Sequence, residues 1–409
     1  PPATSNPQTD RLQDLVVTGT RTLKNLSDGP VKTDVISEEE IKESRYRDAA
    51  QVVMDIPGLN LVDSTGKEGK SAIIQGLGAE HVLVLVDGAP ILQNSSSGVD
   101  LSQISASDIQ RIEVVKGGAS ALYGGQAMGG VINIITKAPT DKTQYQFEVG
   151  SDEPLQGKAN RVLGYNVLQG NLRGKRGRTG FKVGVSHRQT TSIDRDTSSI
   201  ARDTPDTNRL NANASLDQDL NPDQKLQLEL GYGFDRSRSY TSRMMPDTSF
   251  IATQTAGDIR RERMKLGYLS KPSESSNLNT FLLLERTKDQ LSMEDDPRTS
   301  DPENMKSSLF QRQRGEIQYD FSPAESHVLS LGFVAEKNSL NQSTETLISA
   351  GNIHHSAEVD GKSSHTLESY LQDDWILENA ELVTGVRLTH DPEFGNHLDP
   401  KINLLLKPD

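Results

Sequence analysis

The sequence predicts a small α+β domain over residues 21–137, followed by a large antiparallel β-sheet of the kind that forms a transmembrane barrel. Three observations lead to this fold class. A glycine-rich segment between two β-branched runs closes the first part of the chain. After Lys137, strands appear in which apolar and polar residues alternate. The connections between these strands then alternate between short and long, as in a membrane barrel.

Composition narrows the classes of function. The 409 residues carry 44 Lys and Arg against 57 Asp and Glu, a net charge of −13, which argues against a nucleic-acid-binding surface. Cysteine is absent, so disulfides, thiolate zinc sites and a thiol nucleophile are excluded for this sequence. No apolar run reaches about 18 residues, yet a membrane barrel needs none, because its lipid-facing and lumen-facing residues alternate.

The N-terminal arm contains one stretch with strand propensity. Residues 1 to about 12 are rich in Pro, Thr, Asn and Gln, which is typical of a mobile arm. Residues 14–18 then read Asp14, Leu15, Val16, Val17 and Thr18. Two interpretations stay open: a strand that docks on the sheet edge of a partner protein, or the first strand of the following domain.

The following segment mixes helices and strands. Residues 31–36 predict a strand, and Ser37 followed by Glu40 is the capping-box pattern of a helix that continues to about Arg45. A second helix is predicted over residues 48–55, before Pro57. Further strands are predicted at 72–74, 82–86, 109–115 and 131–136, which completes a small domain of helices and strands.

Six glycines lie between the last two of these strands, at positions 117, 118, 124, 125, 129 and 130. A phosphate-binding loop would require the pattern Gly-x-x-x-x-Gly-Lys-Ser/Thr, which does not occur here. The glycines therefore predict a turn-rich structural segment.

This segment resembles the plug of the TonB-dependent outer-membrane receptors. The runs RIEV at 111–114, SALYG at 120–124 and GGVINIITK at 129–137 match the family pattern. The stretches AQVVMDIPGLNL at 50–61 and IQGLGAEHVLVLVDGAP at 74–90 are similar to family segments in the same order. Two positions depart from the pattern: Gln75 stands where the family usually has Arg, and Gly118 where it usually has Pro.

The resemblance implies a division of the chain and roles for several residues. Residues 1–20 form a periplasmic arm, 21–137 the plug and 138–409 the N-terminal portion of the barrel. The stretch Asp14, Leu15, Val16, Val17 and Thr18 is similar to a TonB box, the segment that the TonB protein binds. Arg111, Glu113 and Lys116 are expected to make plug–barrel contacts, while Gln75 removes one charge from those contacts.

Period-two strands dominate the rest of the chain. The clearest example is Leu226, Leu228, Leu230, Tyr232 and Phe234, which alternate with polar residues and glycines. The segments 145–149 and 181–185 show the same alternation. We count about twelve strands of roughly the ten-residue length that spans a bilayer when tilted.

The connections divide into two classes. Short ones are predicted at 219–223, 271–274, 321–324 and 378–380, and long ones at 191–206, 238–257, 292–308 and 341–363. Short turns would face the periplasm and long loops the outside. Barrels of the resembled family have about twenty-two strands and leave no edge open in lipid, so we expect this sequence to be part of a longer receptor.

No constellation of residues predicts catalysis, so we expect neither an enzyme nor a cofactor. His354 and His355 are adjacent in the predicted 341–363 loop, where we expect them to be solvated, with a heme or metal site as the alternative. One long loop contains four aspartates, namely Asp194, Asp196, Asp203 and Asp206. Such a loop can bind calcium, but the spacing lacks the glycine and glutamate of an EF-hand, so we expect a solvated acidic loop, with a calcium site as the alternative.

By resemblance, the chain is an active transporter in the outer membrane of a Gram-negative bacterium. Its expected ligand is a ferric siderophore, with heme or cobalamin as the alternative ligands. The alternative class of protein is a soluble β-rich binding protein. The expected partners are the TonB periplasmic domain, outer-membrane lipid and a small-molecule metal chelate. Candidate ligand contacts are Lys67 and Lys70 for an anionic chelate, and Asn94, Ser95, Ser96 and Tyr123 for hydrogen bonds or stacking.

Overall fold

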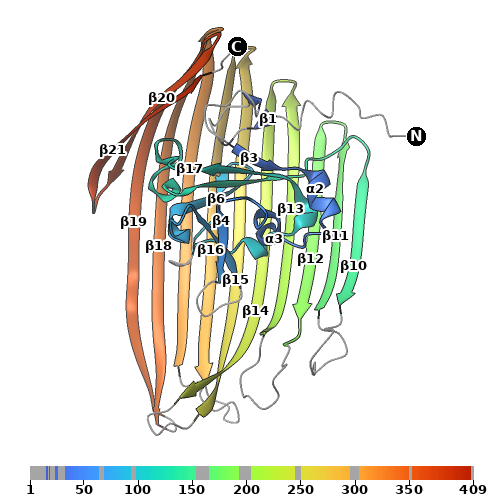
Figure 1. Cartoon of the computed structure of the whole chain (residues 1–409), viewed down its shortest axis with the longest axis vertical. Coiled ribbons are helices and arrows are strands. Elements are labelled where there is room, and N and C mark those ends of the chain that lie inside the picture. Colours follow the sequence, from blue (N-terminus) through green and yellow to red (C-terminus); the bar gives the residue numbers. More distant parts are fainter. Residues whose placement is uncertain are drawn as a thin grey trace.

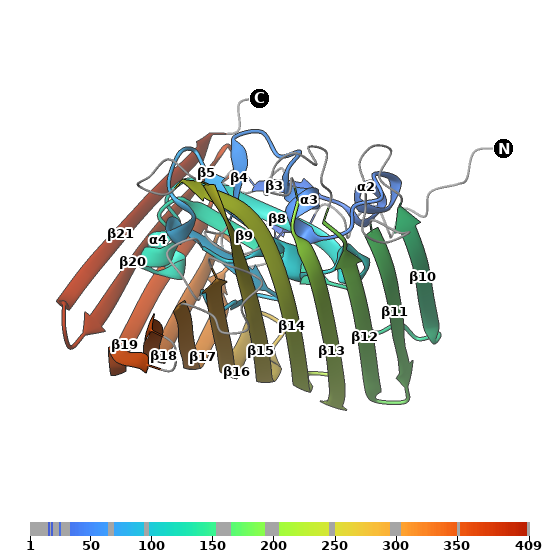
Figure 2. The same cartoon turned by 90° about the horizontal axis from the view of Figure 1, so that it is seen from below.

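The computed structural model describes residues 15–16, 18, 24–25, 33–63, 69–93, 98–152, 165–192, 204–244, 250–294, 304–349 and 352–406. A small mixed domain, the plug, lies on the concave face of a long antiparallel sheet, which we call the wall (Figure 1). Seen from one end, the wall curves around the plug (Figure 2). Among the described residues, no helix is long and apolar enough to cross a membrane.

The plug is built on a five-stranded sheet in the order β3 (Thr33–Ile36), β8 (Ile109–Lys116), β9 (Gly130–Thr136), β6 (Val82–Val86) and β7 (Ala89–Pro90). β6 and β9 are parallel, and the other neighbours are antiparallel. A separate hairpin joins β4 (Leu59–Asp63) and β5 (Lys70–Ile74), and a two-residue ladder joins β1 (Leu15–Val16) and β2 (Lys24–Asn25).

Short helices cover this sheet. They are α2 (Glu38–Glu43), α3 (Ala49–Val53), α4 (Ser120–Tyr123), and the 3-10 turns η2 (Ala79–His81), η3 (Leu101–Gln103), η4 (Ala106–Asp108) and η5 (Gly125–Ala127). The predicted capping box is confirmed, because Ser37 accepts from the Glu40 amide while the Glu40 carboxylate accepts from the Ser37 amide. The Asp48 side chain caps α3.

The central strands of the plug bury both of their faces. Ile112 and Ile134 are fully buried in one apolar cluster, while Val115 and Val131 belong to a second cluster on the other face. Strands that are covered on both faces have near-continuous runs of β-branched residues. These runs made the central strands predictable from the sequence.

In its described residues the wall contains twelve strands, and each pairs antiparallel with the next. They are β10 (Gln144–Asp152), β11 (Tyr165–Arg176), β12 (Thr179–Thr190), β13 (Asp206–Asn221), β14 (Gln224–Met244), β15 (Phe250–Ser273), β16 (Ser276–Glu294), β17 (Asn304–Ala324), β18 (His327–Ser349), β19 (Asn352–Ile376), β20 (Ala380–Asp391) and β21 (Gly395–Leu406). The predicted fold class, a plug followed by an antiparallel sheet of about twelve strands, is confirmed.

The alternation along the wall has a direct structural meaning. On β14, Leu230 and Tyr232 point outward and are 46% and 42% exposed, whereas Asp235 on the inner face is 6% exposed. On β16, Leu282 is 60% exposed and its neighbour Leu283 is fully buried. An outer face of exposed large apolar side chains is what a lipid-facing sheet presents.

Two of the predicted long loops are wrong. Most of 238–257 and 341–363 is strand, since β14 runs to Met244, β15 starts at Phe250, β18 runs to Ser349 and β19 starts at Asn352. The strands reach 25 residues in β19, well beyond the expected ten. The short turn predicted at 321–324 exists but lies at 325–326, because β17 extends to Ala324 and β18 starts at His327.

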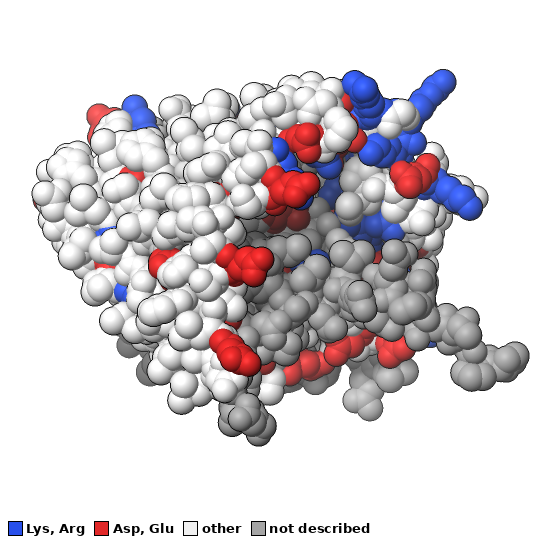
Figure 3. All heavy atoms as spheres, turned by 90° about the horizontal axis from the view of Figure 1, so that it is seen from above, with Lys and Arg blue, Asp and Glu red and all other residues white. Residues whose placement is uncertain are grey.

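The physical reason is that period-two patterning requires one buried face. Where both faces of a hairpin are in water, polar side chains suit both, and only the backbone ladder marks the strand. The four predicted short connections do lie at one end of the wall, the upper end in Figure 1, which we call the turn end. There Asp and Glu gather around the middle of the surface, and Lys and Arg toward one edge (Figure 3).

Candidate functional site

The N-terminal segment is fastened to the plug at Thr18, which is fully buried. Its amide and its hydroxyl both donate to Glu113 Oε2, at 2.9 and 2.6 Å. Asn133 Nδ2 donates to the Thr18 hydroxyl oxygen at 3.0 Å, and the Tyr123 hydroxyl donates to the Thr18 carbonyl at 2.9 Å. We call the side chains of Glu113, Tyr123 and Asn133 the Thr18 socket.

The socket is built from the centre of the plug. Glu113 lies on β8 and Asn133 on the neighbouring β9, where the two residues are paired across the strands, while Tyr123 ends α4. Glu113 is fully buried, and its other oxygen accepts from Arg111 Nε at 2.8 Å. A buried carboxylate is stable only with such charged and hydrogen-bonded partners. Thr18 therefore completes the surroundings of a buried charge.

The predicted TonB box lies immediately before this anchor. Leu15 pairs with Asn25 and Val16 with Lys24 in the β1–β2 ladder, so the backbone of the segment adopts the strand that its sequence predicts. Asp14 and Val17 lie outside the described residues.

Ion pairs join the plug to the wall, and they all have the same arrangement of charge. In each of three pairs joining the two parts among the described residues, the cation comes from the wall and the anion from the plug. They are Arg188 with Asp48 at 2.7 Å, Arg209 with Asp100 at 3.1 Å and Lys182 with Asp108 at 3.6 Å. All six residues are buried or nearly so.

Backbone carbonyls of the plug provide further wall contacts. Arg263 Nη1 on β15 donates to the Pro90 carbonyl at 2.9 Å, and Lys265 Nζ donates to the Asp87 carbonyl at 3.3 Å. On β20, Arg387 Nη1 donates to the Leu122 carbonyl at 2.6 Å. These contacts hold the β6–β7 turn and α4 against the wall.

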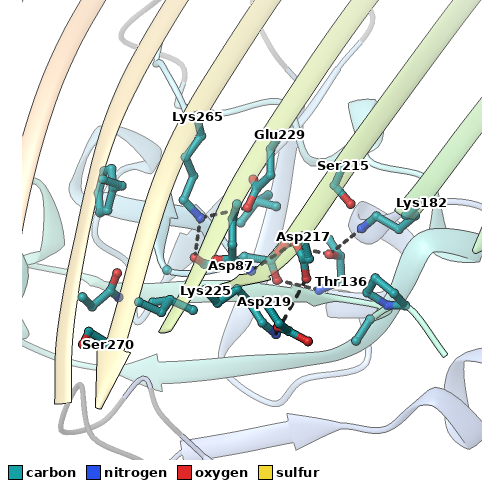
Figure 4. A pocket seen from close by; sticks show the side chains of 18 of the residues that line it. Asp87, Thr136, Lys182, Ser215, Asp217, Asp219, Lys225, Glu229, Lys265 and Ser270 are labelled. Carbon is teal, nitrogen blue, oxygen red and sulfur yellow. Dashed lines mark hydrogen bonds and ion pairs between the residues drawn. The ribbon is translucent and has the colours of Figure 1, made fainter. Parts of the chain in front are cut away.

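A cavity of about 840 Å³ lies between the plug and wall strands β12 to β17 (Figure 4). Lys265 points into it and pairs with Glu229 at 3.0 Å, and Lys182 donates to the Thr136 hydroxyl at 2.8 Å. Tyr123 and Asn133 of the socket also line this cavity, as do turn residues such as Asp223. The socket is therefore connected to the turn end of the wall.

Most of the predicted ligand contacts lie outside the described residues, namely Lys67, Asn94, Ser95 and Ser96. Lys70 begins β5, is exposed and forms an ion pair with Asp63. Tyr123 is 8% exposed inside an apolar cluster, with its hydroxyl on Thr18. This place among the contacts of the N-terminal segment does not fit the predicted ligand role of Tyr123.

The expected plug–barrel contacts of Arg111, Glu113 and Lys116 are corrected by the structure. Arg111 pairs with Glu113, and Lys116 pairs with Asp34 at 2.6 Å, all within the plug. The reason is that other parts of the plug cover both faces of β8, so its side chains reach plug residues first. Contacts with the wall come instead from the rim of the plug.

Sequence reasoning missed several residues of this site. Asn133 carried a usable signal, because it is the one polar residue inside the β-branched run 131–135. The sequence carried no such signal for Arg188, Arg209 and Arg387. An arginine on the polar face of a strand gives the same sequence pattern whether its side chain contacts solvent or the plug.

No metal centre is visible in the described part of the chain, where no three His, Cys, Asp or Glu side chains gather closely enough to hold an ion. His354 and His355 lie on β19 rather than in a loop, and His355 faces Glu345 across the hairpin. Asp206 opens β13 and accepts from the Ser192 amide at 2.7 Å. Asp194, Asp196 and Asp203 fall outside the described residues.

Asp108 gives a pH-dependent prediction. Burial raises the pKa of Asp108 above its ordinary value, although Lys182 opposes this. A raised folded-state pKa means that the group favours folding below its unfolded pKa of about 3.9, and that this contribution is lost as the pH rises through the folded value. We therefore expect Asp108→Asn, which keeps an oxygen for Asn213, to unfold at higher urea than wild type at pH 7.

The difference between the two proteins should shrink toward about pH 4, where the Asp108 carboxyl of the wild type is also becoming neutral. Urea titrations at both pH values measure it. Lower stability of Asp108→Asn at pH 7 would instead show that the Lys182 pair outweighs the burial of the carboxylate.

Comparison with known proteins agrees with this architecture. A family model described as "TonB-dependent Receptor Plug Domain" matches residues 25–131. The iron-regulated outer membrane virulence protein of Vibrio cholerae is 27% identical over 403 residues, covering 95% of this chain and 56% of the relative. Vitamin B12 transporter BtuB of Vibrio vulnificus is 34% identical over 147 residues, 36% of this chain and 24% of the relative. Ferric enterobactin receptor PirA of Pseudomonas aeruginosa is 33% identical over 162 residues, 36% of this chain and 22% of the relative.

Among solved structures, the siderophore receptor PirA from Acinetobacter baumannii matches with a TM-score of 0.72 at 20% identity, over 92% of this chain and 59% of that chain. This likeness concerns the fold. The chain thus spans little more than half the length of the V. cholerae and A. baumannii proteins. The chain thus contains a plug domain of the TonB-dependent receptor family over residues 25–131, followed by an antiparallel wall with the fold of the siderophore receptor PirA.

Proposed function

We propose that the chain is part of an active transporter in the outer membrane of a Gram-negative bacterium, with a ferric siderophore as its ligand. The observation that carries the proposal is the anchoring of Thr18 at the centre of the plug. A segment gripped from the periplasm can move the plug only if it is joined to its load. Here the predicted TonB box is joined by hydrogen bonds to β8, β9 and α4.

Physical properties of the plug support this proposal. Its two-residue ladder at β1–β2 offers little resistance, whereas β8 and β9 are fully buried along most of their length. Local opening costs less free energy than global unfolding. A pull on residues 14–18 would therefore open the arm first and load the central strands next, beside the cavity that runs along the wall.

The ligand class rests on the relatives. The V. cholerae relative is named as iron-regulated and the P. aeruginosa relative as a ferric enterobactin receptor. The V. vulnificus relative is named as a vitamin B12 transporter, so cobalamin, with heme, is the alternative ligand for the same mechanism.

The test is a titration of the detergent-solubilised receptor with the isolated periplasmic domain of TonB. We expect Val16→Pro to weaken binding roughly ten- to hundred-fold, because proline removes a backbone donor from the pairing strand. Val16→Ala keeps the backbone donor and serves as the matched control.

Each titration is repeated with ferric enterobactin, ferric citrate, heme and cobalamin. Binding that one of these ligands strengthens, and that the proline variant loses, supports both the mechanism and the ligand class. Equal TonB binding by wild type and Val16→Pro, or binding by neither, would show that residues 14–18 are a strand of the plug and not a TonB-binding segment.

A further inference from the structure

The Thr18 socket is linked to the wall through one side chain. Asn133 uses both ends of its amide: Nδ2 donates to the Thr18 hydroxyl, and Oδ1 accepts from the Gly88 amide at 3.3 Å. Asn133 is 2% exposed on β9. Its amide therefore bridges the N-terminal segment and the turn between β6 and β7.

That turn has a defined geometry. Asp87 and Gly88 both have positive φ angles, 47° and 73°, which is the backbone of a tight hairpin turn. The Asp87 carboxylate accepts from the amide and the hydroxyl of Thr136, at 2.9 and 2.7 Å. The turn is thus bonded to β9 at both Asn133 and Thr136.

The wall holds the same turn from the other side. Lys265 and Arg263 donate to the carbonyls of Asp87 and Pro90. The Leu92 amide donates to Glu285 Oε1 at 3.3 Å, and Arg263 pairs with that carboxylate at 2.6 Å. Residues 94–97, which lie outside the described residues, directly follow this wall-bound segment in the sequence.

We infer that Asn133 is a positioning residue that couples the wall-bound segment 87–92 to the holding of Thr18. Displacement of that segment removes the Gly88 amide from Asn133 Oδ1. The asparagine amide then no longer has a fixed orientation, and its bond to the Thr18 hydroxyl weakens. The N-terminal segment leaves the socket more often, which makes residues 14–18 available.

The inference rests on the proposed function for its biological meaning, but not for its test. Exchange of the Thr18 amide hydrogen with solvent deuterium reports opening of the socket directly, because that amide donates to buried Glu113. The experiment needs neither TonB nor a transported ligand. It uses the whole receptor in detergent, with overlapping peptides to resolve position 18.

We expect Asn133→Leu, which keeps the size of the side chain and removes both hydrogen bonds, to speed Thr18 exchange roughly ten-fold. The matched control is Asn171→Leu. Asn171 is a wall residue that donates to the Ser107 hydroxyl at 2.9 Å, outside the socket, so its loss should leave Thr18 exchange unchanged.

A second variant guards against general loosening of the plug. Arg263→Met removes the clamp on Pro90 from a wall strand, and Glu285 still pairs with Arg312 at 3.4 Å. We expect Thr18 exchange to rise about three-fold or more, while amides of β8 stay protected. In the double variant Arg263→Met/Asn133→Leu, Thr18 should exchange no faster than in Asn133→Leu alone, because the coupling is already broken.

Unchanged Thr18 exchange in either single variant, or additive effects in the double variant, would overturn the coupling. These outcomes are distinct from failure of the proposed function, which is read from TonB binding by the same proteins. A receptor that couples Thr18 to the wall but never binds TonB would keep this inference and lose the transport proposal.

Discussion

Replacing Gly130 by alanine is expected to destabilise the plug by about 3 kcal/mol, because two penalties combine at this position. Gly130 has φ +146°, a conformation that residues with a Cβ rarely adopt. A Cβ there would lie 2.4 Å from the Val115 carbonyl oxygen and 3.0 Å from Ile74 Cδ1. The first neighbour is backbone in the middle of the sheet, so no side-chain rotation relieves the clash.

Hydrogen exchange of the β8 and β9 amides measures this effect. A loss of about 3 kcal/mol corresponds to roughly hundred-fold faster exchange where opening and closing are fast compared with the exchange step. Gly118→Ala and Gly125→Ala are the matched controls in the same glycine-rich segment, since a Cβ at either place meets nothing within 4 Å. We expect both controls to stay within about 1 kcal/mol of wild type. Wild-type exchange in Gly130→Ala would show that β8 and β9 accommodate the added Cβ without loss of stability.

This contrast also shows what the sequence could predict. The glycine-rich segment matched the plug pattern and so located β8 and β9, but it predicted neither α4 nor which of its six glycines is constrained. Gly130 is constrained by the carbonyl of Val115, a contact that exists only once the two strands pair. Capping at Ser37 and the alternation on β14 were predictable, because each depends on neighbours within a few residues or on one buried face.

The socket and the wall contacts depend on distant parts of the chain instead. Thr18 meets Glu113 across 95 residues, and Arg387 meets Leu122 across 265. The resemblance to the family implied that Glu113 contacts the barrel. Burial of β8 on both faces turned that charge toward the plug interior. Pairings of this kind cannot be recovered from local patterns of one sequence.

Arg387→Met is expected to loosen the plug from the wall by about 3 to 5 kcal/mol, the usual cost of leaving one partner of a buried ion pair alone. Arg387 is fully buried on β20, pairs with Glu368 and donates to the Leu122 carbonyl. Its guanidinium carbon also lies 5.3 Å from the centre of the Tyr370 ring. Methionine fills much of the space but provides no donor, so the Glu368 carboxylate loses this cation.

The double variant Arg387→Met/Glu368→Gln separates the lost contact from the abandoned charge. The amide that replaces the Glu368 carboxylate carries no charge, so we expect the double variant to recover part of the stability that Arg387→Met loses. Exchange of the α4 amides provides the readout, with hydrogen exchange of β12 as an internal reference distant in the wall. A double variant no more stable than Arg387→Met would mean that the bond to Leu122, not the ion pair, holds α4.

The same substitution reaches the N-terminal segment by a second route. Leu122, whose carbonyl Arg387 binds, is followed by Tyr123, and the Tyr123 hydroxyl holds the Thr18 carbonyl. Release of α4 should therefore speed exchange of the Thr18 amide even though Asn133 is intact. If Arg387→Met and Asn133→Leu act additively on Thr18, the wall controls the segment through two independent contacts, one on β15 and one on β20. A less than additive result would instead place both on one cooperative opening of the socket.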